Sequence, residues 1–216
     1  GSRVPVINGG DGANEHPTQA LLDLFTIQKE LTAFNQGIDG MHIAMVGDLK
    51  NGRTVHSLSK LLSQYKNLQV SLVSPNELAM PTYVVDALEN AGHKVTVTDQ
   101  MENNIDADIV YQTRIQEERF ESQEEANKYR GQFRLNNEIY TKFCKSNTVI
   151  MHPLPRDSRS DANELDNDLN QNPNLAIFRQ ADNGVLIRMA LFAMTLGVVD
   201  LVDKYQCDVP WVTSKS

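Results

Sequence analysis

Cysteine is scarce in this chain, and no long apolar run is uninterrupted. The two cysteines among its 216 residues, Cys144 and Cys207, are widely spaced, which excludes a disulfide framework and a cysteine metal site. We therefore expect a cytoplasmic protein with reduced thiols and no bound metal. The most apolar stretch, residues 185–202, contains Arg188 and Asp200. It predicts a buried helix rather than a membrane span. The N-terminal segment lacks the apolar core of a signal peptide.

Basic residues are also in the minority. Lysine and arginine total 20 against 28 acidic residues, giving a net charge of −8. Such a chain repels phosphate backbones, so a nucleic-acid partner is not expected. Any arginine that matters here must act locally, in a pocket. With 40% hydrophobic residues, a packed core is feasible and disorder is not expected.

Short apolar runs alternate with helical patterns along the chain. Strands are predicted at 41–46, 69–73, 94–98, 109–111, 148–151 and 176–178. Helices are predicted from Pro17 onward, at 54–65, at 81–91 and at 184–202, with an exposed loop at 114–133 that leads into a helix. This alternation is typical of parallel β-α-β units. It predicts a Rossmann-like α/β fold, with a doubly wound, mostly parallel sheet of about five strands and helices on both faces.

Unusual polar residues follow three of these strands. In doubly wound sheets, ligands bind beyond the carboxyl ends of the strands, so the residues after Val46, Tyr111 and Met151 should share one rim. There Arg53 and Arg114 would be fixed cations able to clamp a small dicarboxylate. Thr54 and Gln116 would add uncharged donors. Ion pairing of both arginines with surface Asp or Glu is an equally open interpretation.

Two further segments could contribute polar groups. In the helix start HPTQ, His16 could donate to a carbonyl oxygen and Gln19 would lie on the same side one turn later, although ordinary helix capping also explains this sequence. In HPLPR, two prolines stiffen the backbone, so Leu154 and Pro155 could hold an amino group by their carbonyls. A simple turn is the alternative.

Other sites are not indicated. The Gly-rich run at 47–54 has neither the G-x-G-x-x-G spacing of a dinucleotide site nor the G-x-x-x-x-G-K-[ST] form of a nucleotide-binding loop, so no cofactor is expected. No catalytic triad or metal-ligand pattern appears. His42, His56 and His93 receive no role.

Taken together, these segments resemble the aspartate carbamoyltransferase family, specifically its C-terminal L-aspartate-binding domain. The resemblance covers roughly residues 4–202, in order. It rests on VPVINGGDGANEHPTQALLDLFTIQ, GDLKNGRTVHS, LAMP, TRIQEER, HPLPR and QADNGV. The family transfers the carbamoyl group of carbamoyl phosphate to the amine of L-aspartate in pyrimidine biosynthesis. The resemblance thus implies a carbamoyltransferase with these two small molecules as substrates.

The resemblance also implies roles for single residues. His16, the catalytic residue, would polarise the carbamoyl oxygen, with Gln19 and the main-chain oxygens of Leu154 and Pro155 on the carbamoyl group. The L-aspartate contacts would be Arg53, Thr54, Arg114 and Gln116. Asp48 and Lys50 would hold the rim residues in place without contacting the substrate themselves.

Some family features are missing from the sequence. No Ser-Thr-Arg-Thr phosphate loop is present, so the N-terminal carbamoyl-phosphate domain is expected to be absent. Residues 1–202 would then form one L-aspartate-binding domain, followed by a tail at 203–216. Family enzymes also borrow residues from a neighbouring catalytic subunit in a trimer. We therefore expect this chain alone to bind carbamoyl phosphate poorly and to show little or no turnover. Acidic residues crowd the loop after Gln116, at Glu121, Glu124 and Glu125.

The last apolar helix has a partner in the family, where it packs on the N-terminal domain. Without that domain, residues 184–202 would expose apolar surface and favour self-association.

Two other interpretations stay open. Ornithine carbamoyltransferase shares an HP-x-Q motif, but its H-C-L-P turn and S-M-G loop are not found here. A non-catalytic regulatory or scaffold module of the same family would explain the missing phosphate loop. The intact arginines, HPTQ and HPLPR are evidence against that module.

Overall fold

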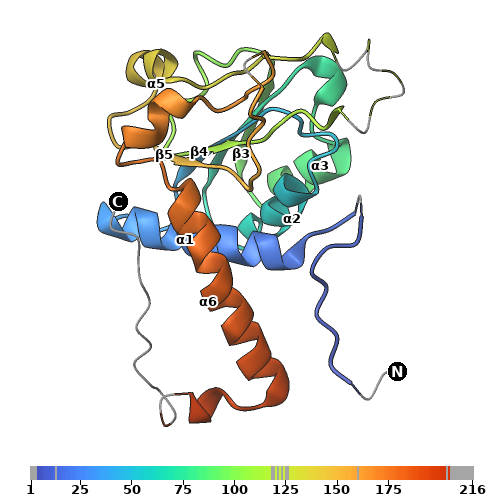
Figure 1. Ribbon diagram of the computed structural model, residues 1–216, viewed down its shortest axis with the longest axis vertical. Coiled ribbons are helices and arrows are strands. Elements are labelled where there is room, and N and C mark those ends of the chain that lie inside the picture. The colour runs from blue at the N-terminus through green and yellow to red at the C-terminus, as the bar shows by residue number, and fades with distance from the viewer. Residues whose placement is uncertain are drawn as a thin grey trace.

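The computed structural model describes residues 4–12, 14–117, 120, 122, 124, 127–159, 161–202 and 204. Within these residues a five-stranded parallel sheet, in the order β3-β2-β1-β4-β5, carries helices on both faces (Figure 1). The strands are β1 (His42–Val46), β2 (Gln69–Val73), β3 (Lys94–Thr98), β4 (Ile109–Gln112) and β5 (Val149–Met151). The α-helices are α1 (Pro17–Ala33), α2 (Arg53–Leu62), α3 (Thr82–Asn90), α5 (Asn137–Phe143) and α6 (Ile177–Leu196). The 3-10 helices are η1 (Asn76–Leu78), η3 (Asn167–Gln171) and η4 (Val199–Leu201).

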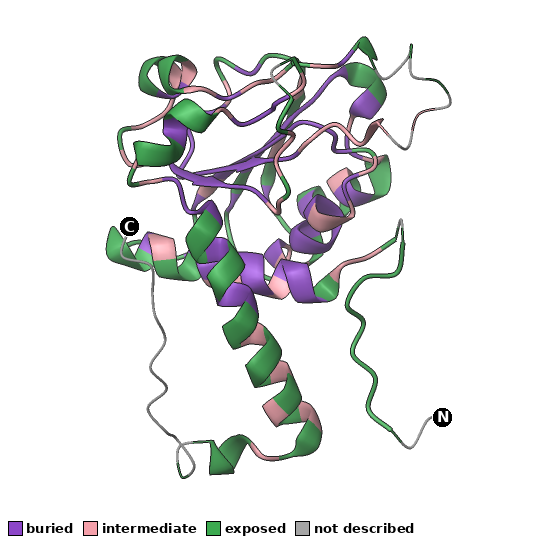
Figure 2. Cartoon of the chain, in the orientation of Figure 1, coloured by how far each residue is buried: buried purple, intermediate pink, exposed green. Residues whose placement is uncertain are grey.

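The central strands are buried on both faces, as continuous apolar runs in parallel sheets require. In β1, Ile43 and Met45 face one core with α1, α2 and α3. Ala44 and Val46 face the other, with residues of α5 and η3. Figure 2 shows these strands as the buried centre of the molecule. The predicted α/β class, the parallel sheet and its helices on both faces are therefore confirmed.

The direction in which the chain adds strands to the sheet reverses at β1. From β1 the sheet extends through β2 and β3 on one side and through β4 and β5 on the other. The loops after β1 and β4 therefore diverge and leave a crevice at the carboxyl edge. As the sequence predicted, the ends of β1, β4 and β5 are neighbours.

One predicted strand is wrong. Residues 176–178 do not form a strand, because Leu175 makes only an isolated bridge to Ile150 and α6 begins at Ile177. Two hydrogen bonds, from the Ile150 N–H to the Asn174 carbonyl (2.9 Å) and from the Ala176 N–H to the Ile150 carbonyl (2.9 Å), make this bridge. A short apolar run cannot distinguish a strand from a buried helix start.

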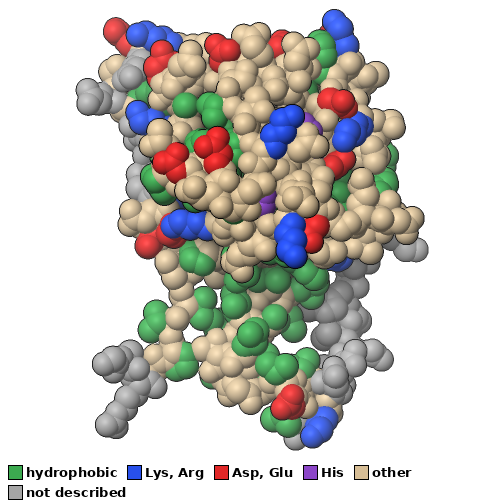
Figure 3. All heavy atoms as spheres, turned by 180° about the vertical axis from the view of Figure 1, so that it is seen from behind, with side chains coloured by type: hydrophobic (Ala, Val, Ile, Leu, Met, Phe, Trp, Pro, Cys, Tyr) green, Lys and Arg blue, Asp and Glu red, His purple; other side chains and the backbone are tan. Residues whose placement is uncertain are grey.

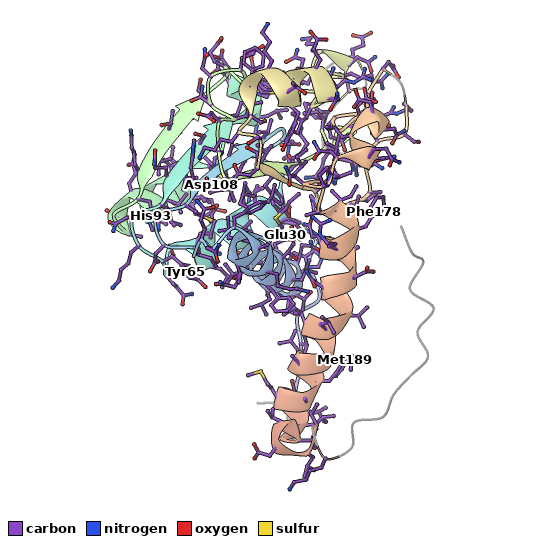
Figure 4. The ribbon with its side chains drawn as sticks, turned by 90° about the vertical axis from the view of Figure 1, so that its left-hand side faces the viewer. Glu30, Tyr65, His93, Asp108, Phe178 and Met189 are labelled. Carbon is purple, nitrogen blue, oxygen red and sulfur yellow. The ribbon has the colours of Figure 1, made fainter. Side chains whose placement is uncertain are left out.

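The apolar helix at 184–202 is confirmed as helical in its first part, but the expectation that it is buried is wrong. Gly197 ends α6 in a left-handed conformation (φ 68°), and η4 follows. Beyond the turn that packs on α1, the helix projects from the body (Figures 1 and 4). Its exposed apolar residues include Val185, Leu186, Met189, Phe192, Met194 and Leu196. The reason is that neither the sheet nor α1 reaches this half.

Some expectations concern residues outside those described, namely Cys207, Glu121, Glu125 and 205–216 of the tail. In the part of the chain that the structure covers, none of the helices combines the length and hydrophobicity needed to cross a membrane. The same part contains no group of three or more His, Cys, Asp and Glu placed to hold a metal ion.

The turn after β1 depends on a glycine. Gly47 has φ +116°, and a Cβ there would lie 2.3 Å from the Thr113 carbonyl oxygen. We expect Gly47→Ala to lower the free energy of unfolding by about 2–4 kcal/mol, from the left-handed φ and the steric overlap. Urea denaturation measures this. In the matched control Gly37→Ala, the new Cβ meets nothing within 4 Å, so the change should stay within about 0.5 kcal/mol. Equal effects of the two variants would contradict the prediction.

Candidate functional site

A cavity of about 370 Å³ opens at the carboxyl ends of β1, β4 and β5. Every residue that the sequence predicted to contact a substrate lines it: His16, Gln19, Arg53, Thr54, Arg114, Gln116, Leu154 and Pro155. Thr113, His152, Pro153, Gly12 and Gly52 complete the lining. The expected rim therefore exists. The roles assigned to its residues stay predictions.

Arg53 is the first residue of α2, and its guanidinium is held by main chain. Its Nη1 donates to the Gly12 carbonyl at 2.8 Å, so this contact involves no carboxylate. At a helix N-terminus the peptide N–H groups add positive potential. The surface ion-pair interpretation therefore does not describe this contact of Arg53, which keeps its charge at the edge of the cavity.

Arg114 follows β4, next to a network of carboxylates that bind other arginines. Glu117 accepts bidentate hydrogen bonds from Arg130 (both 3.0 Å) and from Arg159 (3.1 and 2.8 Å). Asp157 accepts from the Arg159 Nε at 3.0 Å. Hydrogen bonds from Arg159 lower the pKa of Asp157 to about 2, and the nearby charge of Arg114 contributes. Two acidic residues beside the cavity are thus engaged by arginines that do not line it.

Asp48 joins the loops after β1 and β4. Its carboxylate is fully buried and accepts from the Asn51 N–H at 3.0 Å and the Gln116 N–H at 3.3 Å. The Gln116 Nε2 in turn donates to the Asn51 carbonyl at 2.8 Å. Burial raises the pKa of Asp48, and these hydrogen bonds oppose the shift. The geometry supports an organising role for Asp48. Lys50 is exposed and does not line the cavity.

The HPTQ segment begins α1 without a side-chain cap. His16 occupies the N-cap position but makes no capping hydrogen bond through its ring, so the capping interpretation is wrong for this residue. The Thr18 Oγ1 lies 3.4 Å from the His16 Nδ1. Burial, followed by the charges of Arg53 and Arg188, lowers the pKa of His16. The imidazole is therefore neutral near pH 7, and donation from Thr18 to Nδ1 would leave Nε2–H as a donor.

A buried carboxylate that the sequence interpretation missed lies behind Gln19. Asp23 is fully buried and accepts from the Gln19 Nε2 at 2.9 Å, the Gln180 Nε2 at 2.6 Å and the Tyr111 hydroxyl at 2.7 Å. Burial raises its pKa to about 6, against these hydrogen bonds. An acidic residue inside the apolar run LLDLF, four positions after Gln19, was the available signal.

His152 holds the turn that contains Leu154 and Pro155. Its Nδ1 accepts from the Leu154 N–H at 2.8 Å and its Nε2 lies 2.6 Å from the Glu164 Oε1. Because Nδ1 accepts, Nε2 carries the proton and donates to Glu164. Leu154 has φ +55°, and the Leu154–Pro155 bond is cis. His152 thus holds the Leu154 backbone at a positive φ that residues other than glycine rarely adopt. Reasoning from the sequence named HPLPR but gave His152 no role.

The cavity lies in an α/β domain, at the point where the strand order of a parallel sheet reverses, and two arginines line it. Residues 39–195 match the family described as aspartate/ornithine carbamoyltransferase, Asp/Orn binding domain, and residues 1–29 match its carbamoyl-P binding domain. The chain therefore belongs to the aspartate/ornithine carbamoyltransferase family, in its aspartate carbamoyltransferase group.

Relatives and solved structures agree with this placement. The chain is 70% identical over 99% of its length to the aspartate carbamoyltransferase catalytic subunit of Cellvibrio japonicus, and 68% identical over 100% to that of Saccharophagus degradans. It covers 64% of each relative. The catalytic subunit of M. jannaschii aspartate transcarbamoylase superposes with a TM-score of 0.79 at 40% identity, over 92% of this chain and 61% of that one. The Trypanosoma cruzi enzyme in complex with N-(phosphonacetyl)-L-aspartic acid gives 0.76 at 37%, over 87% and 58%.

These matches bear on two earlier expectations. The family resemblance is confirmed. The assignment of residues 1–202 to one L-aspartate-binding domain stays a prediction. The carbamoyl-P domain match at 1–29 contains HPTQ.

Burial of Asp23 predicts a pH dependence of stability. Its pKa in the folded chain is raised from 3.8 to about 6, so folding favours the protonated acid. This stabilisation is complete below about pH 4 and is lost as the pH rises through 6. It amounts to about 3 kcal/mol at most, since one pKa unit corresponds to about 1.4 kcal/mol. Urea unfolding at several pH values should show wild type losing stability relative to Asp23→Asn over this window. A pH-independent difference between the two would contradict it.

Proposed function

We propose that this chain supplies the L-aspartate side and part of the carbamoyl side of an aspartate carbamoyltransferase active site. The observation that supports it most strongly is the meeting of Arg53, Arg114, His16 and Gln19 around one cavity. The solved structures of the Trypanosoma cruzi enzyme include complexes with aspartate, with carbamoyl phosphate and with N-(phosphonacetyl)-L-aspartic acid. The function proposed is carbamoyl transfer to L-aspartate in pyrimidine biosynthesis.

The two arginines match a dicarboxylate. A guanidinium presents paired N–H donors that fit a carboxylate, and Arg53 and Arg114 approach the cavity from different loops, after β1 and after β4. Thr54 and Gln116, both in the lining, add neutral donors. A substrate with carboxylates at both ends is thereby held with its amine directed inward.

The carbamoyl side needs a donor and acceptors. Neutral His16, with Nε2–H, would donate to the carbamoyl oxygen as the aspartate amine attacks the carbamoyl carbon. The new C–N bond forms while the bond from that carbon to the phosphate oxygen breaks, the amine loses a proton, and phosphate leaves. A donor aimed at the developing oxyanion lowers the barrier, and the arginine clamps supply orientation. No covalent intermediate with the protein is required.

The remaining groups are proposed to come from partners. The chain covers 64% of the length of its relatives, and a carbamoyl-phosphate domain would supply the phosphate loop. Neighbouring catalytic subunits, in a trimer, would complete the site. The exposed half of α6 is the surface proposed to contact that domain. Hydrophobic side chains gather on this projection (Figure 3), and Met189, which lies on it, is 60% exposed (Figure 4).

The arginine clamp is tested by Arg114→Ala. We expect calorimetry of the 216-residue chain with N-(phosphonacetyl)-L-aspartic acid to show affinity reduced at least tenfold, since a hydrogen bond to a charged group contributes about 1.5–3 kcal/mol. The matched control is Arg179→Ala, which removes a surface arginine bound to Glu30 (2.7 Å) outside the cavity. Equal affinities of Arg114→Ala and wild type would contradict the clamp. A folded wild type that binds nothing would favour the non-catalytic module.

The exposed half of α6 predicts self-association of the isolated chain. Apolar patches of this kind bury themselves against another chain. Sedimentation velocity should show concentration-dependent association that the double change Met189→Glu and Phe192→Glu weakens. Tyr83→Glu, at a residue of α3 that is 57% exposed, is the matched control and should leave association unchanged. A strictly monomeric wild type would contradict the prediction.

A further inference from the structure

The carboxylate of Asp23 fixes the orientation of two side-chain amides. Both the Gln19 Nε2 (2.9 Å) and the Gln180 Nε2 (2.6 Å) donate to its Oδ1, and the Tyr111 hydroxyl donates to its Oδ2 at 2.7 Å. An ionised carboxylate only accepts hydrogen bonds. Each amide must therefore present its NH₂ to Asp23 and direct its carbonyl oxygen elsewhere.

The carbonyl oxygen of Gln19 is therefore directed toward the cavity. Its side chain lines the cavity, and among the described residues its Oε1 accepts no hydrogen bond. With Nε2 bound to Asp23, the group that Gln19 offers to a ligand is an acceptor. The opposite orientation would place two oxygens against each other in a buried site.

The Gln180 amide is oriented by Asp23 in the same way, and it supports the opposite wall of the cavity. Its Oε1 accepts from the His152 N–H at 2.9 Å, and the His152 ring accepts from the Leu154 N–H at 2.8 Å. Because the Leu154 N–H already donates to His152 inside the turn, the main-chain groups there that a ligand can reach are carbonyls. The two walls of the cavity thus share one buried carboxylate, which is itself absent from the lining.

We infer that Asp23 is a positioning residue that makes the carbamoyl side of the cavity selective for a ligand bearing an NH₂ group. Gln19 offers its carbonyl oxygen to a ligand as an acceptor because its NH₂ group donates to Asp23. The inference rests on the proposed function and deepens it, since it gives the reason a carbamoyl group is preferred over an acetyl group of the same shape.

Two derivatives of L-aspartate separate this effect from dicarboxylate binding. N-carbamoyl-L-aspartate and N-acetyl-L-aspartate carry the same carboxylates and the same carbonyl, but one ends in NH₂ and the other in CH₃. One net hydrogen bond contributes about 0.5–1.5 kcal/mol, so wild type should prefer the carbamoyl compound about two- to twelvefold. NMR titration of the full chain measures both affinities.

The variant Asp23→Leu should abolish the preference. Leucine is similar in size but has no acceptor, so neither glutamine NH₂ is held and the Gln19 amide is released. Asparagine would keep one oxygen, and both amides donate to a single oxygen of Asp23, so Asp23→Asn should retain the preference. With Asp23→Leu we expect the ratio of the two affinities to approach one, while N-acetyl-L-aspartate binds within about twofold of wild type. In a Gln19→Leu background, Asp23→Leu should have no further effect on the ratio.

The matched control is Asp108→Leu, which removes another buried carboxylate in the same way. Asp108 precedes β4, at the end opposite the cavity, and accepts from the His42 N–H (2.8 Å) and the Lys145 Nζ (2.8 Å). It should lower stability without changing the preference. A general loss of rigidity would change the ratio in both variants, and that result would overturn the assignment to Asp23.

A second measurement needs no variant at Asp23. The Nε2 groups of Gln19 and Gln180 share one oxygen atom, so their protons should show a nuclear Overhauser effect in wild type. Its absence would overturn the inferred orientation.

Failure of the inference and failure of the proposed function give different results. Binding of both compounds without preference, or a preference that survives in Asp23→Leu, overturns the inference and leaves the proposed function standing. No binding of either compound by the folded wild type overturns both.

Discussion

The reversal of strand order at β1 is the constraint on which the cavity depends. Parallel strands place all their carboxyl ends at one edge, and the chain leaves β1 and β4 in opposite directions across the sheet. Loops from β1, β4 and β5 therefore surround a space that no side chain of the sheet fills. Gly47 permits the close approach of the first two loops, and Asp48 then ties them through Asn51 and Gln116.

Acidic side chains beside the cavity are bound to arginines that do not line it. Near the cavity, Glu117 and Asp157 are engaged by Arg130 and Arg159, while a main-chain carbonyl holds Arg53. Asp23, a carboxylate behind Gln19, is buried under neutral donors. Burying such a group is costly, and its hydrogen bonds explain how it is tolerated.

Helix α6 serves two purposes along its length. Its first turns pack on α1 and contribute Gln180, which hydrogen-bonds Asp23 and His152, and Asn183, which bonds Thr26 at 2.9 Å. Its later turns are exposed and apolar. The exposed apolar surface and a support of the cavity wall therefore belong to one helix.

Much of the fold and the candidate site could be predicted from the sequence. Apolar runs and helical periodicity are local signals, so the strands, their parallel arrangement and the rim that gathers Arg53, Arg114 and Leu154 followed from the order of residues. His16 was assigned to the same site only through the family resemblance. The strand at 176–178 could not be judged in this way, because a single bridge and a helix start share one apolar pattern. The apolar composition of the last helix wrongly predicted its burial, because cover is a property of neighbours, whereas the family resemblance predicted that this helix exposes apolar surface.

The buried polar network was decided by tertiary structure alone. Asp23, Tyr111 and Gln180 are separated by many residues and carry no spacing that marks them as partners, yet packing of α1, β4 and α6 brings them within hydrogen-bond distance. His152 likewise acquires its role from Glu164 and Leu154. The sequence by itself determined which chemical groups reach the edge of the sheet, since local periodicity controls where strands end. Only the packed structure decided which of those groups donate and which accept, because that depends on contacts between distant segments.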